Sequence, residues 1–103
     1  MAKGYWVARL DVADTEKYKD YIAANQIAFR KYGARYVVRG GKYENPEGSS
    51  RSRNVVIEFE SYQKALDCYH SPEYQHAISL RKKPISEGDI VIIEGYEGAQ
   101  PGQ

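Results

Sequence analysis

The chain of 103 residues has little cysteine and almost no net charge. Its one cysteine, Cys68, has no partner for a disulfide within the chain, so a reducing cytoplasm is the expected location. With 15 basic and 14 acidic residues the formal net charge is +1, which gives no general attraction for nucleic acid or an anionic membrane. No apolar run approaches the roughly 20 residues that span a bilayer, and no long apolar signal segment is expected at the N-terminus. We therefore expect neither a nucleic-acid partner nor a membrane partner.

Tyrosine, by contrast, is abundant: the chain has ten tyrosines and one tryptophan. A tyrosine side chain has an apolar body and a polar tip, which suits half-buried positions in a pocket or a subunit contact. The length allows one modest core, so residues 1–96 are expected to form a single domain, and residues 97–103 to be a disordered tail.

The first half of the chain shows a strand pattern and then a helix pattern. Residues 4–12 alternate, with Trp6 and Leu10 on one face. Asp14 is a suitable N-cap for a helix that Gly33 ends. One mostly apolar stripe follows the helical period between them: Tyr18, Tyr21, Ile22, Asn25, Phe29 and Tyr32. Residues 34–40 are predicted to be a second strand, and the polar residues 44–53 an exposed loop or mobile flap.

The second half repeats this order. Residues 54–59 are predicted to be a strand, with Val55, Ile57 and Phe59 on one face. Ser61 is the expected N-cap of the next helix, which stops and restarts where Ser71 caps and Pro72 begins a further turn. Residues 89–96 are the predicted last strand.

The order β-α-β-β-α-β predicts a ferredoxin-like α+β fold, with an antiparallel four-stranded sheet and helices on one face. Trp6, Leu10 and their counterparts on the third strand should then be covered by the helices. The opposite face should hold Val7 and Val56. A single domain of this size has no further element that could cover them. A homodimer packed sheet to sheet would bury this face.

Four segments resemble a known family: Gly4-Tyr5-Trp6, Arg39-Gly40-Gly41, Asn54 to Phe59 with Ser61, and Tyr69-x-Ser71-Pro72-Glu73-Tyr74 with Arg81. Over roughly residues 4–96 the chain resembles the domain-of-unknown-function family numbered 1330. The resemblance implies a dimeric α/β barrel of ferredoxin-like topology. That wider superfamily includes cofactor-independent monooxygenases, a haem-degrading branch and relatives of chlorite dismutase. No catalytic residues follow from the resemblance.

The candidate ligand-binding residues are expected to line a small cleft where the sheet meets the second helix: Tyr5, Arg39, Tyr69, Tyr74 and Arg81. The arginines would orient an anion, and the tyrosines would stack on a ring. In the alternative interpretation, the aliphatic part of the Arg81 side chain packs on the core and its guanidinium lies in water. Arg9 and Glu58 should share the face away from the helices, where an ion pair at the dimer interface is favoured over a functional site.

Other reactive side chains favour structural roles. Ser71 is interpreted as a cap rather than a nucleophile, and Cys68 as a buried, inert thiol. His70 and His76 lack zinc-ligand spacing, so no metal and no cofactor are expected, with haem on a proximal histidine as the alternative. RNA-recognition modules share this strand order, but they need aromatic residues where Asn54 and Val56 stand.

Two hypotheses about function remain. In the first, the cleft binds or converts a small anionic or aromatic metabolite; an enzyme of this kind would carry out cofactor-independent oxidation or isomerisation. In the second, the protein is a non-catalytic dimeric interaction module whose tyrosines serve packing.

Overall fold

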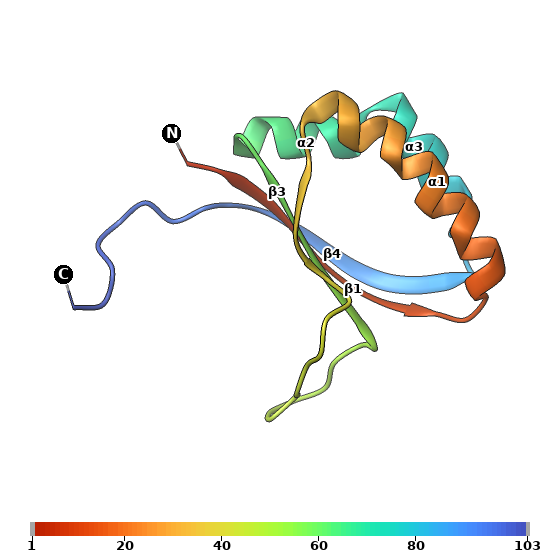
Figure 1. Ribbon diagram of the computed structural model, residues 1–103, viewed down its shortest axis with the longest axis horizontal. Coiled ribbons are helices and arrows are strands. Elements are labelled where there is room, and N and C mark those ends of the chain that lie inside the picture. The colour runs from red at the N-terminus through yellow and green to blue at the C-terminus, as the bar shows by residue number, and fades with distance from the viewer. Residues whose placement is uncertain (1, 103) are drawn as a thin grey trace.

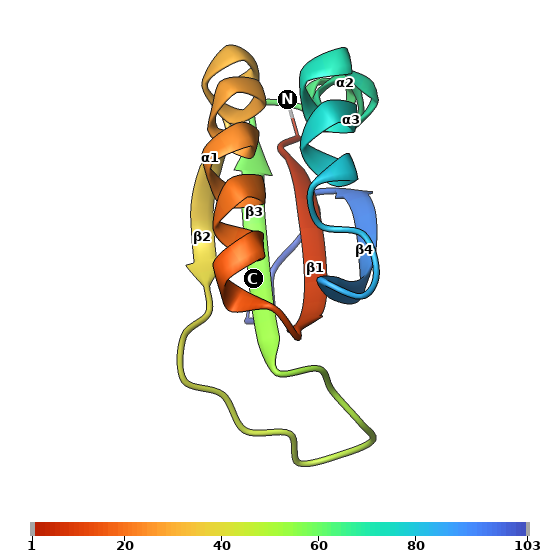
Figure 2. The same cartoon turned by 90° about the vertical axis from the view of Figure 1, so that its right-hand side faces the viewer.

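The computed structural model describes residues 2–102 and contains four strands and three helices. In chain order these are β1 (Gly4–Val12), α1 (Thr15–Tyr32), β2 (Arg35–Arg39), β3 (Arg53–Phe59), α2 (Tyr62–His70), α3 (Pro72–Ser79) and β4 (Ser86–Glu94). The strands form one antiparallel sheet in the order β2-β3-β1-β4. All three helices lie over one face of this sheet (Figures 1 and 2). The predicted ferredoxin-like fold is confirmed.

The helix boundaries follow from local chemistry. Asp14 accepts a hydrogen bond from the backbone N–H of Lys17, and Gly33 ends α1 in the left-handed conformation at φ 70°. Ser71 separates α2 from α3 because its hydroxyl accepts from the N–H of Tyr74 at 3.1 Å and donates to the carbonyl of Cys68 at 2.7 Å. The predicted stop and restart at Ser71 is confirmed, and Ser71 is a cap.

The core lies between the helices and the covered face of the sheet, with Trp6 at its centre. The Trp6 ring makes edge contacts with Phe29, Tyr69 and Tyr74, and a tilted contact with Phe59. Its indole N–H donates to the carbonyl of Ala65 at 2.8 Å, so the one polar atom of this buried side chain has a partner. Leu10, Val55 and Ile57 are also buried, as predicted.

No described helix lies over the other face of the sheet, which we call the uncovered face, although Arg51 reaches Asp11 and Asp89 at one end of it. Its centre is a row of four valines, one from each strand and each opposite the next: Val38, Val56, Val7 and Val91. We call this the valine row. Val38 and Val91, at the two edges of the sheet, are 40% and 52% exposed, and Ile93, two residues from Val91 on β4, is 51% exposed. The predicted apolar face away from the helices is therefore present.

Three segments differ from the prediction. β4 begins at Ser86 rather than at residue 89 because the long β1 continues to pair with it as far as Val12. Residues 40–52 form an exposed connection, and Arg51 anchors it to Asp11 and Asp89 at 3.0 and 2.9 Å. Residues 95–102 lie outside helices and strands. Met1 and Gln103, which the predicted domain and tail include, lie outside the described residues.

The helices of residues 2–102 do not combine the length and the apolar character that crossing a bilayer requires.

Candidate functional site

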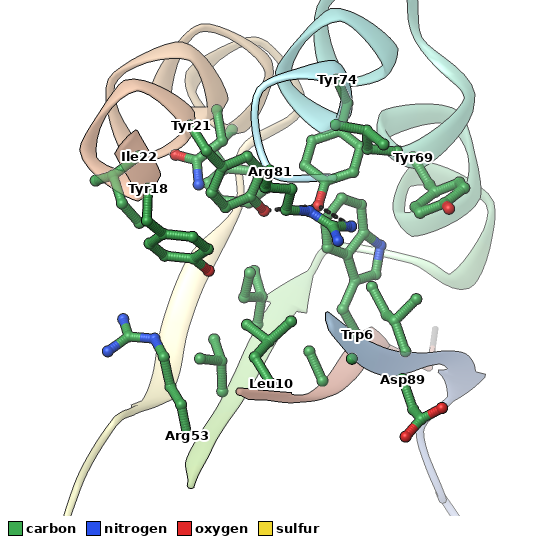
Figure 3. Close-up of a pocket in the computed structure, with 18 of the residues that line it drawn as sticks. Trp6, Leu10, Tyr18, Tyr21, Ile22, Arg53, Tyr69, Tyr74, Arg81 and Asp89 are labelled. Carbon is green, nitrogen blue, oxygen red and sulfur yellow. Dashed lines mark hydrogen bonds between the residues drawn. The ribbon is translucent and has the colours of Figure 1, made fainter. Parts of the chain in front are cut away.

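A cavity of about 230 Å³ lies between the covered face of the sheet, α1 and α3 (Figure 3). Its walls are mostly aromatic and aliphatic, and two arginines, Arg53 and Arg81, also line it. The aromatic residues of the lining are Trp6, Tyr18, Tyr21, Phe29, Tyr36, Tyr69 and Tyr74. A concave apolar site with a few polar groups is the usual form of a small-molecule site.

Three side chains meet at the roof of the cavity. The hydroxyls of Tyr21 on α1 and Tyr74 on α3 are 2.7 Å apart, which joins the two helices by a buried hydrogen bond. Arg81, just beyond α3, donates from Nη2 to the Tyr74 hydroxyl at 3.5 Å, and its guanidinium carbon lies 5.2 Å from the centre of the Tyr21 ring. The dashed lines in Figure 3 mark the two hydrogen bonds. Arg81 is thus held over the cavity by two tyrosines rather than by a carboxylate.

Arg53 reaches the cavity from the other side, from the first residue of β3. It lies opposite Leu10 in the register, and so on the helix-covered side of the sheet. Gly40 makes room for it: a Cβ at Gly40 would lie 2.9 Å from Nη1 of Arg53, and Gly40 also has φ +63°. The left-handed backbone favours glycine at position 40, whereas the flexible end of the Arg53 side chain could move to relieve the second contact.

The electrostatic character of the cavity is positive. Asp89 is the one carboxylate in its lining, but it points away from the cavity in Figure 3 and accepts from Arg51. Neither Arg53 nor Arg81 forms an ion pair within residues 2–102, and the Nε atom of each is buried without a hydrogen-bond partner there. Buried donors without acceptors are costly, so both arginines favour an acceptor in the cavity.

The hydroxyls of Tyr18 and Tyr74 remain protonated at neutral pH. Burial raises the pKa of Tyr18 to about 12, even though Arg53 and Arg81 act in the opposite direction. Burial also raises the pKa of Tyr74, with Tyr21 adding to the effect. These groups can therefore donate hydrogen bonds to a ligand, but they are poor proton acceptors.

Of the five residues predicted to line a common cleft, the structure brings three together and places two elsewhere. Tyr69, Tyr74 and Arg81 line the cavity. Tyr5 lies on the opposite face of the sheet, where its hydroxyl donates to Glu58 at 3.0 Å. Arg39 is exposed and does not line the cavity; its guanidinium carbon lies over the ring of Tyr36, 4.3 Å from the ring centre. The grouping of all five in one cleft was wrong, and ligand binding by the other three stays a prediction.

Arg9 and Glu58 do not pair with each other within residues 2–102, and an ion pair between them at a dimer interface stays a prediction. Arg9 lies opposite Asn54 and Asp89, four residues along β3 from Glu58. Glu58 accepts instead from Tyr5 and from Nη1 of Arg35 at 3.4 Å. The two residues do share the uncovered face, as expected.

Tyr18, Tyr21 and Arg53 line the cavity but were not predicted to belong to the cleft. Tyr18 and Tyr21 were recognised only as part of the apolar stripe of α1, and Arg53 only as part of a solvated loop. A signal for Arg53 was present, because it stands two residues before Val55 and therefore shares its face. The cavity is also bounded by α1, and not only by the second helical segment as predicted.

The remaining reactive groups lie outside the cavity lining. Cys68 is fully buried, and burial raises the pKa of its thiol to about 12, which agrees with an inert thiol. His70 and His76 are exposed on α2 and α3. Within residues 2–102 no three His, Cys, Asp or Glu side chains are grouped closely enough to hold a metal ion.

Three solved structures from different bacteria have a fold similar to that of this chain. RPA0582 of Rhodopseudomonas palustris, a protein of unknown function, is 14% identical with a TM-score of 0.70, over 94% of this chain and 85% of that one. SnoaB of Streptomyces nogalater, a cofactor-independent oxygenase, is 12% identical with a TM-score of 0.62, over 98% and 99% of the two chains. A dimeric protein of unknown function and ferredoxin-like fold from Bacteroides fragilis is 15% identical with a TM-score of 0.52, over 89% and 95%. At these identities the likeness shows the fold alone.

No protein of curated function matches the chain significantly. The model of the family described as "Domain of unknown function (DUF1330)" matches residues 3–96, which is nearly the whole chain. The resemblance found in the sequence is confirmed, and the chain belongs to the DUF1330 family.

Proposed function

We propose that the cavity binds a compact organic anion, namely a carboxylate on a small apolar or aromatic body. The observation that carries this proposal is Arg81: its guanidinium lines an otherwise largely apolar cavity, contacts two tyrosines, and has no carboxylate partner within residues 2–102. A guanidinium in such surroundings binds a carboxylate through parallel N–H···O bonds.

The size of the cavity limits the ligand. An engineered protein cavity of roughly 150 Å³ is large enough to bind benzene. At about 230 Å³ the present cavity therefore has room for one six-membered ring with a small substituent. The rings of Tyr18, Trp6 and Phe29 in its walls suit edge or face contacts with such a ring.

The protonation states favour binding over proton transfer. The lining within residues 2–102 contains no imidazole and no thiol, and the tyrosines with raised pKa values keep their protons. A reaction in this cavity would therefore use Arg81 to stabilise an enolate or another oxyanion, without a strong base. Cofactor-independent oxidation, as in the structurally similar SnoaB, or isomerisation would be the reaction class.

We also propose that the protein is a homodimer joined through the valine row. Apolar side chains from all four strands lie in one row, exposed at Val38 and Val91 and half-buried at Val7 and Val56, and a second copy would cover the row by symmetry. The similar protein from Bacteroides fragilis is described as dimeric. The uncovered face is also what favours the alternative function, a non-catalytic interaction module. The single cysteine suits a cytoplasmic location.

A thermal-shift experiment with benzoate and its neutral analogue benzamide tests the binding proposal. Benzoate at about 100 times its Kd should stabilise the folded state by about 2.7 kcal/mol, which is a shift of several degrees in Tm. Benzamide should give little shift, because it lacks the charge that Arg81 would bind.

Arg81→Gln and Arg39→Gln are the matched variants. Both remove one guanidinium, but only Arg81 lines the cavity. Arg81→Gln should abolish the benzoate shift, and Arg39→Gln should preserve it. A full shift in Arg81→Gln would contradict the proposed site, and the interaction module would then be the better account.

A further inference from the structure

The second arginine of the cavity extends the proposed function. Of the arginines in residues 2–102, Arg53 and Arg81 are the two whose Nε atoms are buried without a partner, and both line the same cavity. Arg81 alone would be enough to bind a monocarboxylate. Arg53 therefore needs an explanation of its own.

Arg53 and Arg81 approach the cavity from different elements. Arg53 extends from the start of β3 and lies against Gly40, whereas Arg81 follows α3 and donates to Tyr74. Figure 3 shows the two guanidinium groups on different sides of the cavity, with Tyr18 on the side of Arg53. The positive charges of both arginines act to lower the pKa of the Tyr18 hydroxyl, against the larger effect of burial. The arrangement is that of two separate anion anchors rather than one bidentate clamp.

Charge balance then determines the kind of ligand. Two cations border a small, mostly apolar space, and the one nearby carboxylate, Asp89, is turned away and bonded to Arg51. A ligand with one negative charge would compensate one arginine and leave the other uncompensated. A ligand with two anionic groups separated by a short body would compensate both.

We propose that the natural ligand is a compact dicarboxylate, with one carboxylate bound by Arg81 and the other by Arg53 beside the Tyr18 hydroxyl. This rests on the proposed function and specifies the class of ligand. The aromatic walls would hold the body between the two carboxylates, and the protonated Tyr18 would donate to the carboxylate at Arg53. Arg53 would thus be a specificity-determining residue that separates dicarboxylates from monocarboxylates.

Isothermal titration calorimetry with benzoate and the three benzene dicarboxylates, phthalate, isophthalate and terephthalate, tests this inference. The three isomers carry the same charges on the same ring and differ in the spacing of the carboxylates. At least one of them should bind the unmodified protein about tenfold or more tightly than benzoate, as expected for an added charge-assisted contact. Benzoate binding equal to or tighter than that of all three would overturn the inference while leaving the proposed function intact.

The variants separate the two arginines. Arg53→Gln should weaken the best dicarboxylate by a larger factor than benzoate and so remove most of its advantage, and Arg53→Lys should restore part of that advantage. Arg39→Gln, outside the cavity, should change neither affinity. Equal weakening of benzoate and dicarboxylate by Arg53→Gln would overturn the assignment of separate anchors. Failure of all four acids to bind the unmodified protein would overturn the proposed function itself.

Discussion

The two faces of the sheet differ in which groups have partners. On the helix-covered face the apolar side chains are packed, with Trp6 and Phe59 each 1% exposed, while the cations Arg53 and Arg81 have no counterion within residues 2–102. On the uncovered face the acidic groups have partners: Glu58 pairs with Arg35, and Asp11 and Asp89 pair with Arg51. There the valine row is left without a covering layer.

This difference suggests a separate role for each face. A face with packed apolar groups and unpaired cations is suited to a small anion. A face with paired charges and uncovered apolar groups is suited to another apolar surface, and a second copy of the chain provides one. Ligand binding and association would then use opposite sides of the same four strands.

The largest expected effect is on the covered face, from Trp6→Ala. It removes the central ring of the core and the hydrogen bond to Ala65, so the free energy of unfolding should fall by about 3–5 kcal/mol. Urea unfolding followed by circular dichroism measures this, since the substitution removes the only tryptophan. Ile93→Ala, on the uncovered face, should cost much less in dilute solution. Equal losses of unfolding free energy in the two variants would contradict the difference proposed between the two faces.

The next effect is on association, from Val91→Asp. A carboxylate in the valine row would be buried without a partner in a dimer, so the dissociation constant should rise by at least about 100-fold. Sedimentation velocity over a range of concentrations measures this, with Ala23→Asp on the exposed side of α1 as the control. A stable monomer of the unmodified protein at micromolar concentration would refute the proposed dimer.

A smaller effect is expected at high pH, from Tyr18. Its pKa is about 12 in the folded protein against a usual value of 10, so the folded state holds this proton more tightly than the unfolded chain does. The associated stability is fully present below pH 10 and is lost as the pH rises from 10 to 12. Urea midpoints measured across this range should fall, and Tyr18→Phe should make the fall shallower. An unchanged slope in that variant would show that Tyr18 is not shielded in the cavity.

The smallest effect is expected at the boundary of the faces, from Arg51→Met. Its ion pairs with Asp11 and Asp89 involve exposed carboxylates, and such pairs contribute little to global stability. The urea midpoint should hardly move, while amide exchange in residues 40–52 should become faster. A large drop in the midpoint would mean that this connection belongs to the cooperative core.

The fold could be predicted from the sequence because its signals are local. Alternation placed Trp6 and Leu10 with Val55 and Ile57 on one face, and short caps such as Ser71 fixed where the helices begin. The same alternation also contained the correct position of Tyr5, opposite to Trp6, and of Arg53, beside Val55. Tyr5 was wrongly included in the cleft and Arg53 was left out because residues were chosen by their chemical type, before the face of the sheet on which they lie was considered.

The rest of the site depends on tertiary structure. The register of the pairing between β2 and β3 shifts between Tyr36 and Val38. No residue type in this segment predicts such an irregularity. The exposed position of Arg39 over Tyr36 could therefore not be derived from the sequence. Tyr18 and Tyr21 are ordinary members of an apolar helix stripe. They become part of a cavity only because α1 and α3 approach the sheet with space left between them, which depends on the packing of the whole core.

The central claim is that the covered face holds an anion site at Arg81. A crystal structure of the protein with bound isophthalate tests it most directly. The account predicts density for the acid inside the cavity, with a carboxylate oxygen about 2.7–3.2 Å from a nitrogen of the Arg81 guanidinium. Density for the acid on the uncovered face, with the cavity unoccupied, would contradict the account.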